Sequence, residues 1–327
     1  MAECPRLLVA DIGGTNARFA IVEDDGDPGA PVSLACDDFP DLVDTVGAGL
    51  RLLAPRAPPR AAAIAVAAPI TGDRVVLTNR GEWRFSARAA AGALGLDRLT
   101  VVNDLCALAL ALPVLGRADW TPLGPGPSNG ADGAPQAVLG PGTGLGTAAV
   151  VPSGEGWVPV AGEGGHVTLA ATDDRQAALI RQIRDSGARA TPDRLVSGPG
   201  LARIHAALAA IDGVDGVPHQ AQDIAAGACP YCVETVALFA CLLGALAGDL
   251  ALTYGARGGV YVGGGVVPKL GVAFPGDLFR REFEAKGRFA EYVAAIPTRL
   301  ITHPHATLIG AGQAFGRIGA GLVHVVS

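Results

Sequence analysis

Two stretches of this chain share one form: an apolar run, a turn rich in glycine and threonine, and a second apolar run. The first is LLVADIGGTNARFAIV at residues 7–22, and the second is QAVLGPGTGLGTAAVV at residues 136–151. Apolar runs on both sides of a glycine-containing turn are typical of a β-hairpin. Two equivalent hairpins predict a bilobed molecule in which each domain begins with the same unit and the turns face each other across a cleft. A chance likeness between two hairpins is the simpler alternative.

Strand-like and helix-like runs alternate along the chain, which favours an α/β fold with a mixed sheet. Before a loop rich in Gly, Pro and Ser at 123–135, the pattern predicts strands at 60–70, 74–79 and 98–104 and helices at 41–53, 86–96 and 105–112. After the loop, it predicts helices at 173–186, 200–211 and 233–254 and strands at 258–264 and 298–302. A final helix at 306–319 could pack back onto the first domain.

Length and composition narrow the function classes. At 327 residues, 50% of them hydrophobic, the chain is long enough for two domains with substantial cores. Its formal net charge of -6 argues against a nucleic-acid partner, whose phosphates need a basic surface. The opening MAECPRLLVAD does not resemble a signal peptide. The most apolar stretch, 235–248, is too short to span a bilayer and predicts a buried helix, so no membrane partner is expected.

The cysteines predict a reduced environment. Six of them are scattered along the chain and do not form the framework of a secreted disulfide-rich protein. We therefore expect a cytoplasmic enzyme. Cys229 and Cys232 have CxxC spacing, but no second Cys/His pair completes a zinc site in the sequence. The sequence favours a small apolar pair near the start of a helix.

The two turns have the composition of a phosphate site. Glycines allow main-chain N–H groups to converge on an anion, and Thr15 and Thr143 add hydroxyl donors. Asp11 would repel a phosphate unless a cation lies between them, and the Mg²⁺ that accompanies a nucleotide is such a cation. The sequence has no GxGxxG motif that opens a helix and no GxxxxGK[ST] motif, which disfavours the Rossmann and P-loop types of nucleotide site.

Seven motifs in this chain resemble, in order, those of the bacterial glucokinases: LVADIGGTNARFA, APITGDRVVLTN, VVND, GPGTGLG, GEGGH, SGPGL and VGGGVVP. Each is weakly specific alone, but together they cover nearly the whole chain. The resemblance implies the two-lobed actin/hexokinase-like (ribonuclease H-like) fold, with a mixed sheet in each lobe and a cleft between them. We expect a small α/β domain at 1–113 plus 306–327 and a large α/β domain at 114–305.

The resemblance also implies an activity. A glucokinase transfers the γ-phosphate of ATP to the 6-hydroxyl of D-glucose, which gives glucose 6-phosphate and ADP in the first step of glycolysis. Mg²⁺ is the implied cofactor, and a homodimer is implied by the family alone. Nothing in the sequence locates the dimer interface.

The motif VVND supplies the implied catalytic residue. It ends a predicted strand, which is where ligand-binding residues of an α/β domain lie. By resemblance, Asp104 is the base for the 6-hydroxyl, and Asn103 hydrogen-bonds neighbouring hydroxyls. The alternative from the residues alone is that Asp104 is the N-cap of the helix predicted at 105–112.

Sugar binding is implied for Glu163 and His166 of GEGGH and for the main chain of Gly144. A Glu/His pair without a third ligand does not favour a metal site. The family has one more sugar-binding glutamate shortly before SGPG, where this chain has Asp193. Aspartate is shorter by one methylene, about 1.5 Å, which leaves the tightness of glucose binding and the sugar selectivity open.

The resemblance assigns the remaining motifs to the nucleotide. Terminal phosphates of ATP are assigned to Gly13, Gly14, Thr15 and Asn16, with Asp11 near Mg²⁺ through water. The second phosphate turn is assigned to Gly142, Thr143 and Gly144. Gly264 and Gly265 of VGGGVVP would let the base approach the backbone, although a glycine-rich strand-to-helix turn would have the same composition.

Other functions explain fewer of these features. A hexose or aminosugar kinase with another sugar preference is the nearest alternative. A kinase related to the sugar-responsive repressors would carry CxCGxxGCxE after its sugar-binding histidine, but residues 167–180 contain no cysteine. A non-catalytic sugar sensor or DNA-binding regulator would need a helix-turn-helix before residue 7. A glycoside hydrolase could use Asp104 and Glu163 as its carboxylates, but the phosphate turns would then be unexplained. A chaperone-like ATPase would lack VVND and GEGGH.

Overall fold

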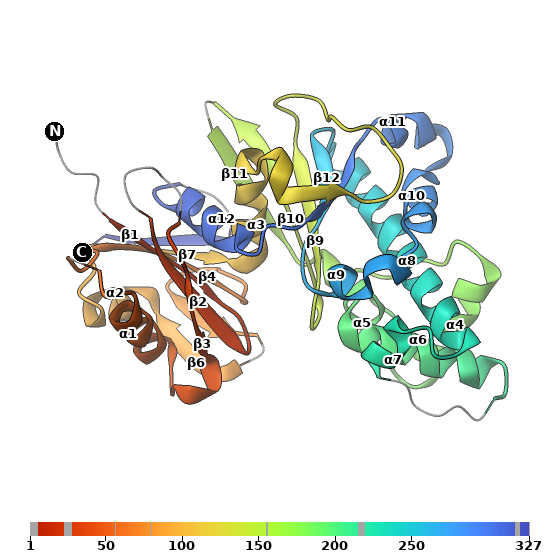
Figure 1. The fold of residues 1–327 in the computed structure, drawn as a ribbon, viewed down its shortest axis with the longest axis horizontal. Coiled ribbons are helices and arrows are strands. Elements are labelled where there is room, and N and C mark those ends of the chain that lie inside the picture. Colours follow the sequence, from red (N-terminus) through yellow and green to blue (C-terminus); the bar gives the residue numbers. More distant parts are fainter. Residues whose placement is uncertain are drawn as a thin grey trace. The chain divides into compact units, whose positions relative to one another are not determined.

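The chain forms two compact units (Figure 1). The structure is a computed structural model that describes residues 6–22, 28–55, 57–78, 80–154, 156–214, 220–317 and 321–326. Unit 1 contains residues 1–116, 149–161 and 303–327, and unit 2 contains residues 117–148 and 162–302. The sequence-based boundaries at 113 and 306 differ by a few residues and leave out the segment 149–161.

Residues 149–161 belong to unit 1 because they contact its C-terminal part. They come from strands β10 (Leu145–Ser153) and β11 (Gly156–Gly162). Arg317 donates from Nη1 to the backbone oxygen of Trp157 at 3.0 Å. A Cβ placed on Gly321 would lie 3.0 Å from the Cβ of Ala161. A strand pattern carries no information about such contacts, so the sequence could not show this grouping.

A six-stranded mixed sheet forms the centre of unit 1, in the order β14-β7-β4-β1-β2-β3. The strands are β1 (Leu7–Ile12), β2 (Asn16–Val22), β3 (Val32–Ala35), β4 (Ala61–Val66), β7 (Arg98–Asn103) and β14 (Leu322–Val326). β1, β4 and β7 are parallel, whereas β2, β3 and β14 are antiparallel to their neighbours. A separate hairpin pairs β5 (Arg74–Leu77) with β6 (Arg80–Ser86). Asn79, at the end of the strand predicted here, lies outside the described residues.

Helices pack against both faces of this sheet. They are α1 (Leu42–Leu53), α2 (Ala87–Ala93), α3 (Asp104–Ala111) and α12 (Ala306–Ala314). On β1, Leu8, Ala10 and Ile12 share a core with residues of α1 and α2. Val9 points the other way, toward Gly312 of α12. Burial on both faces explains why β4 is an unbroken apolar run whose six residues are all buried. The prediction that the last helix packs onto the first domain is confirmed.

Helices α3 and α12 approach each other closely because of one glycine. A Cβ on Gly310 of α12 would overlap the backbone oxygen of Ala107 of α3. Gly312, two residues along the same helix, is different: a Cβ there would lie 3.7 Å from Val9 Cγ1, an ordinary van der Waals distance. Close packing of this pair matters for function because α3 begins at Asp104, the predicted base.

A second six-stranded sheet has the order β11-β10-β9-β12-β13-β8. Its other strands are β8 (Trp120–Pro122), β9 (Gln136–Pro141), β12 (Gly259–Val262) and β13 (Thr298–Ile301). As in the first sheet, three consecutive strands are followed across the sheet by two parallel strands and an antiparallel edge strand. This shared order shows that the hairpins at 7–22 and 136–153 are equivalent units and not a chance likeness.

Unit 2 also carries most of the helices. They are α4 (Asp174–Asp185), α5 (Pro192–Leu195), α6 (Gly198–Ile211), α7 (Ala221–Ala225), α8 (Pro230–Tyr254), α9 (Val266–Leu270), α10 (Gly276–Glu284) and α11 (Ala290–Ala294). Among the described residues, α8 alone is long and apolar enough to cross a membrane, so the expectation that this region is too short was wrong. Burial of 78% of its most apolar window shows that α8 is a core helix, which confirms the buried helix predicted for this region.

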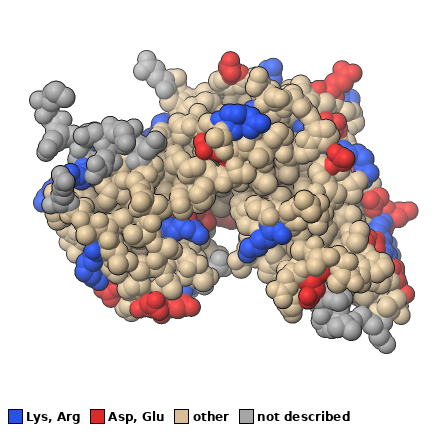
Figure 2. Space-filling model, in the orientation of Figure 1, with Lys and Arg blue, Asp and Glu red and all other residues tan. Residues whose placement is uncertain are grey.

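Charged residues of both signs are interspersed on the face drawn in Figure 2, and uncharged residues lie between them. This mixture fits a chain whose 25 Lys and Arg residues nearly balance its 31 Asp and Glu residues.

We expect Gly310→Ala to lower stability because its methyl group would force α3 and α12 apart. Overpacking of this kind costs about 1–3 kcal/mol, more than the gain of about 1 kcal/mol from replacing glycine by alanine in a helix. Gly312→Ala is the matched control and should keep that gain. The measurement is the midpoint of thermal unfolding, which should fall for Gly310→Ala and stay or rise for Gly312→Ala. Equal midpoints for the two variants would contradict the close packing.

Candidate active site

Parallel strands bring two of the predicted motifs to one edge of the unit 1 sheet. Ile12 of β1 is aligned with Val66 of β4, and Val66 is aligned with Asn103 of β7. Neighbouring strands are about 4.8 Å apart, so the ends of β1 and β7 lie on the order of 10 Å from each other. Carboxyl ends of parallel strands are where α/β sheets bind ligands. The structure therefore places the turn at 13–16 and the pair Asn103–Asp104 at the same edge.

The first turn is held by contacts to its carbonyl groups. Gly13 donates its N–H to Asn16 O at 3.0 Å, which closes the turn between β1 and β2. Cys36 N donates to Thr15 O at 2.8 Å. Arg80 Nη1 donates to Gly14 O at 3.0 Å and to Asp37 at 2.6 Å. Arg80 thus bridges the turn and the segment after β3, a role that the sequence did not reveal.

Asp11 is a carboxylate largely withdrawn from water beside this turn. It is aligned across the hairpin with Arg18, and Arg18 Nη1 lies 3.4 Å from Asp11 Oδ2. Burial raises the pKa of Asp11, and the charge and hydrogen bond of Arg18 lower it only in part. The ionised carboxylate is therefore undercompensated, and an additional cation next to it would be stabilised.

Asn103 and Asp104 have distinct local roles. Asn103 is the N-cap of α3: its Oδ1 accepts from Cys106 N at 3.1 Å. The cap that was considered for Asp104 thus belongs to Asn103, and Asp104 is the first residue of the helix. Asp104 Oδ1 accepts from Leu105 N at 2.8 Å and from Asn103 Nδ2 at 3.2 Å. These bonds fix the orientation of the carboxylate at the start of α3.

In unit 2, the second turn is closed in the same way and is contacted by Asp193. Gly142 N donates to Gly144 O at 2.8 Å. Asp193, in the first turn of α5, accepts from Leu145 N at 2.9 Å through Oδ1. A Cβ on Gly144 would overlap that carboxylate oxygen, so a larger residue there would displace the Asp193 side chain from this contact. The aspartate that replaces the family glutamate therefore supports the turn directly.

The GEGGH segment lies against the same turn. Gly164 N donates to Thr147 Oγ1 at 3.1 Å, and His166 N donates to Glu163 O at 2.9 Å. A Cβ on Gly165 would overlap Leu145 O and would lie 3.5 Å from Asp193 Cβ. The two glycines let the segment approach β10 closely, while Glu163 and His166 are exposed. The structure thus brings Gly144, Glu163, His166 and Asp193 into one group.

A pocket of about 820 Å³ opens beside the second turn. Its lining includes three predicted nucleotide residues, Gly142, Thr143 and Gly265, and it also includes Gly198, Pro199, Leu201, Ala221, Gln222, Ala225, Val266, Lys269 and Leu270. Gly264, the residue before Gly265, has a φ of +73°, and a Cβ on it would overlap Pro141 O, so its conformation and surroundings both favour glycine. Gly198 N donates to Gly142 O at 2.8 Å, which ties the start of α6 to the turn.

The predicted site residues thus fall into two groups. Unit 1 holds Asp11, Gly13, Gly14, Thr15, Asn16, Asn103 and Asp104, and unit 2 holds Gly142, Thr143, Gly144, Glu163, His166, Asp193, Gly264 and Gly265. Sequence reasoning missed Arg18, Arg80, Gln222 and Lys269. The motif SGPGL was the available sequence signal for this region, but it was given no role. The structure shows that its Gly198 contacts Gly142.

Comparison with known proteins places the chain among sugar kinases. The family model described as glucokinase matches residues 8–317. A glucokinase of Aromatoleum aromaticum is 46% identical over 97% of this chain and 96% of its own length. The crystal structure of a glucokinase from an Antarctic psychrotroph has a TM-score of 0.85 and 34% identity, and the match covers 95% of this chain and 98% of that one. A ROK family glucokinase from Streptomyces griseus, solved with glucose and AMPPNP, shares the fold with a TM-score of 0.62 and 20% identity, over 94% of this chain and 98% of that one.

We expect Asp11→Asn to stabilise the protein at neutral pH. Because the pKa of Asp11 is raised above 3.8 on folding, the folded chain holds this proton more tightly than the unfolded chain. The resulting stability is present below pH 3.8 and is lost as the pH rises through the raised pKa. Asp11→Asn has no carboxyl group to lose this proton. The difference in the midpoint of thermal unfolding, variant minus natural protein, should therefore increase as the pH rises through the raised pKa. Asp132 is exposed, and Asp132→Asn is the control. Its difference in unfolding midpoint from the natural protein should not change with pH. A flat difference for Asp11→Asn as well would refute the desolvation argument.

Asp193 could act through its hydrogen bond to the turn or through its charge. Asp193→Asn removes only the charge, whereas Asp193→Ala removes both. Asparagine can still accept from Leu145 N, whereas alanine cannot. We expect Asp193→Ala to raise KM for ATP by about tenfold, the effect of losing about 1.4 kcal/mol at one hydrogen bond. Asp193→Asn should raise it much less. Steady-state kinetics with varied ATP measures both, and equal effects on KM for ATP would show that the contact with the turn is unimportant.

Proposed function

Because the chain belongs to the glucokinase family and is an ATP-dependent glucose kinase, we propose a role for each of the two residue groups. Unit 1 supplies the base and a set of phosphate ligands, and unit 2 supplies the nucleoside pocket and the sugar-binding side chains. The observation that carries this proposal is the alignment of Ile12, Val66 and Asn103, which puts the first turn and Asp104 at one sheet edge.

The nucleotide is proposed to bind through the glycine-rich turns. Gly14, Thr15 and Asn16 would donate to the terminal phosphates, because contacts from Cys36 and Arg80 already occupy the carbonyl side of this turn. Gly13, whose N–H closes the turn on Asn16 O, would let the phosphates approach the backbone. Gly142, Thr143 and Gly144 would serve the phosphates from unit 2. The pocket of about 820 Å³ has the volume of a small-molecule site, and Gly264 and Gly265 would let the base lie close to the backbone.

Asp11 is the residue we propose for Mg²⁺, through a bound water. Its carboxylate is withdrawn from water and only partly compensated by Arg18, and an oxygen ligand is what this cation prefers. When bound, Mg²⁺ neutralises charge on the phosphates during transfer.

Asp104 is proposed as the general base. In the reaction the oxygen of the glucose 6-hydroxyl bonds to the γ-phosphorus, the bond from that phosphorus to the β-phosphate oxygen breaks, and ADP leaves. Asp104 accepts the proton of the hydroxyl. The bonds from Leu105 N and Asn103 Nδ2 keep the carboxylate oriented for this step. The product, glucose 6-phosphate, would enter glycolysis.

Glucose is proposed to be recognised by Asn103, the main chain of Gly144, Glu163, His166 and Asp193. Asn103 Nδ2 already donates to Ala68 O and to Asp104, and its Oδ1 accepts from Cys106 N. An amide oxygen can accept twice, so the second acceptor position of Oδ1 is the one that suits a sugar hydroxyl. Glu163 and His166 are exposed and thus accessible to a sugar.

We also propose a cytoplasmic location and a homodimer. A cytoplasmic location rests on the scattered cysteines, and a homodimer rests on the family resemblance. Light scattering of the purified full chain measures the mass in solution and thus tests the dimer directly.

Asp104→Asn tests the proposed base. We expect kcat for glucose phosphorylation to fall by about 10²–10⁴-fold, the range for loss of a general base, while KM for ATP changes little. The measurement is a Mg-ATP phosphorylation assay with glucose, mannose and fructose, which also defines the sugar range.

Asp44→Asn is the matched control, since Asp44 also lies in the first turn of a helix of unit 1. It should leave kcat unchanged. Near-normal turnover by Asp104→Asn would remove the base assignment.

A further inference from the structure

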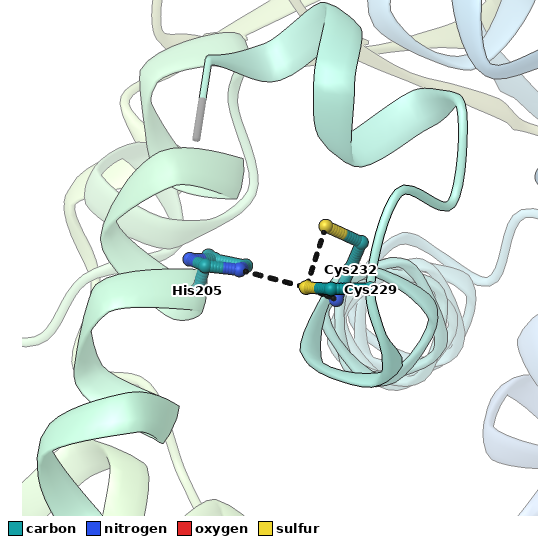
Figure 3. A group of neighbouring side chains, drawn as sticks. All are labelled: His205, Cys229 and Cys232. Atoms are coloured by element: carbon teal, nitrogen blue, oxygen red, sulfur yellow. Dashed lines mark hydrogen bonds between the residues drawn. The ribbon is translucent and has the colours of Figure 1, made fainter. Parts of the chain in front are cut away.

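Two cysteines and a histidine that belong to neither group of site residues meet between two helices of unit 2. Cys229 and Cys232 come from the start of α8, and His205 comes from α6. His205 Nε2 lies 3.4 Å from Cys229 Sγ, and the two sulfurs lie 3.0 Å apart. Figure 3 shows the imidazole and both sulfurs pointing toward one another. Sequence spacing alone showed the CxxC pair but not the histidine 24 residues before it.

The local structure explains why the two sulfurs lie on one side of the helix. Cys229 is the N-cap of α8, and its Sγ accepts from Cys232 N at 3.3 Å. Pro230 follows at the first helical position, which suits the fixed φ of proline. Residues three apart on a helix are neighbours, so Cys232 Sγ lies beside Cys229 Sγ.

A sulfur cap is unusual in this chain. Elsewhere in the described residues, the side chains that cap a helix N-terminus accept the hydrogen bond through oxygen. They are Asp41, Ser86, Asn103, Asp173, Thr191 and Ser197. Oxygen is the preferred acceptor at this position. Cysteine at position 229 therefore calls for a reason other than helix capping.

The donors have the chemistry of a zinc site. Thiolate and imidazole are the ligands that Zn²⁺ prefers, whereas Mg²⁺ and Ca²⁺ prefer oxygen. Tetrahedral zinc with bonds of about 2.3 Å to sulfur and about 2.0 Å to nitrogen separates two sulfurs by about 3.8 Å and a sulfur from a nitrogen by about 3.5 Å. Here the donor atoms all lie within 4.8 Å of one another. Small side-chain rotations would bring all three to bonding distance from one ion.

Burial favours retention of such an ion. Cys232 is fully buried, His205 is 4% exposed, and Cys229 is partly exposed. Tyr231 packs edge-on against the imidazole of His205, with the ring centroids 6.3 Å apart, and so restricts its rotation. The partial exposure of Cys229 leaves a route by which a metal and a water as fourth ligand could enter.

We propose that His205, Cys229 and Cys232 bind one Zn²⁺, with an exchangeable fourth ligand. The ion would join α6 to the start of α8. Both ends of this link lie near the pocket: α6 begins at Gly198, which contacts Gly142 and lines the pocket, and α7, which precedes α8, lines it with Ala221, Gln222 and Ala225. The bound metal therefore supports a wall of the pocket and raises the affinity of the protein for ATP. This effect on affinity rests on the proposed function of the pocket.

Metal binding is tested on the full chain without any assay of activity. The protein is purified under a non-metal-binding reductant, stripped with a chelator and titrated with Co²⁺, which reports thiolate ligation and tetrahedral geometry by its absorption. We expect one Co²⁺ per chain, displaced by one Zn²⁺. Cys232→Ser and His205→Gln should weaken binding by more than about 100-fold, beyond the effect of changing an outer-shell partner.

Two further variants control for folding. Cys229→Ser removes a ligand but keeps an oxygen that can cap α8, so it should fold and still fail to bind tightly. Cys241→Ser alters another buried cysteine of α8 outside the cluster and should bind Co²⁺ as the natural protein does. Absence of thiolate–cobalt absorption in the reduced natural protein would overturn the proposal, as would its persistence in Cys232→Ser. A Cys229–Cys232 disulfide in the isolated protein, with no metal taken up after reduction, would overturn it in favour of a redox pair.

The link to the pocket has its own measurement. Binding of AMPPNP to the stripped and the zinc-loaded protein is followed by calorimetry, and we expect affinity to fall several-fold on stripping in the natural protein but not in Cys232→Ser. Equal affinities in stripped and loaded natural protein would refute the supporting role. If AMPPNP does not bind either form, the nucleotide proposal fails while the cobalt titration still decides the metal site.

Discussion

The register of three parallel strands is the constraint on which the unit 1 site depends. Ile12, Val66 and Asn103 are aligned across β1, β4 and β7, so the first turn and the start of α3 occupy the same sheet edge. A slip of one residue in β7 would turn its side chains to the opposite face. The small residues of β4 permit this alignment with helices packed on both faces, and Gly310 lets α12 lie directly on α3.

The second sheet repeats the strand order but uses it for a different purpose. Each sheet contains a hairpin with a glycine-containing turn, β1–β2 in one and β9–β10 in the other, and the strand before the turn has a parallel neighbour. In unit 1 the helix that follows β7 begins with a carboxylate, Asp104, whereas in unit 2 the segment that follows β12 contains Gly264 and Gly265, and Gly265 lines a pocket. Asp193 contacts the second turn, and the absence of a side chain at Gly144 leaves room for its carboxylate. The same framework therefore provides a reactive group in one unit and a binding cavity in the other.

Local sequence patterns predicted most of the helices and strands. They could not predict the contacts between segments that are distant in the sequence. Hairpins, the buried strand of β4 and the long helices α1, α4, α6 and α8 follow from apolar periodicity and turn residues. The short edge strands β3, β8 and β14 and the short helices α5, α7 and α9 carry little periodic signal. The alternative that Asp104 caps α3 was off by one residue, because both Asn and Asp are good caps and Asn103 takes that position. His205 could not be joined to Cys229 and Cys232 from sequence, because the packing of α6 on α8 creates that proximity.

The most direct test of the central claim is a crystal structure of the full chain with glucose and AMPPNP bound. The account predicts that a carboxylate oxygen of Asp104 lies about 2.6–3.2 Å from the 6-hydroxyl of glucose, within reach for proton transfer. It also predicts that main-chain N–H groups of residues 14–16 donate to the terminal phosphate. A sugar bound with its 6-hydroxyl out of reach of Asp104, or a terminal phosphate bound away from residues 13–16, would contradict it.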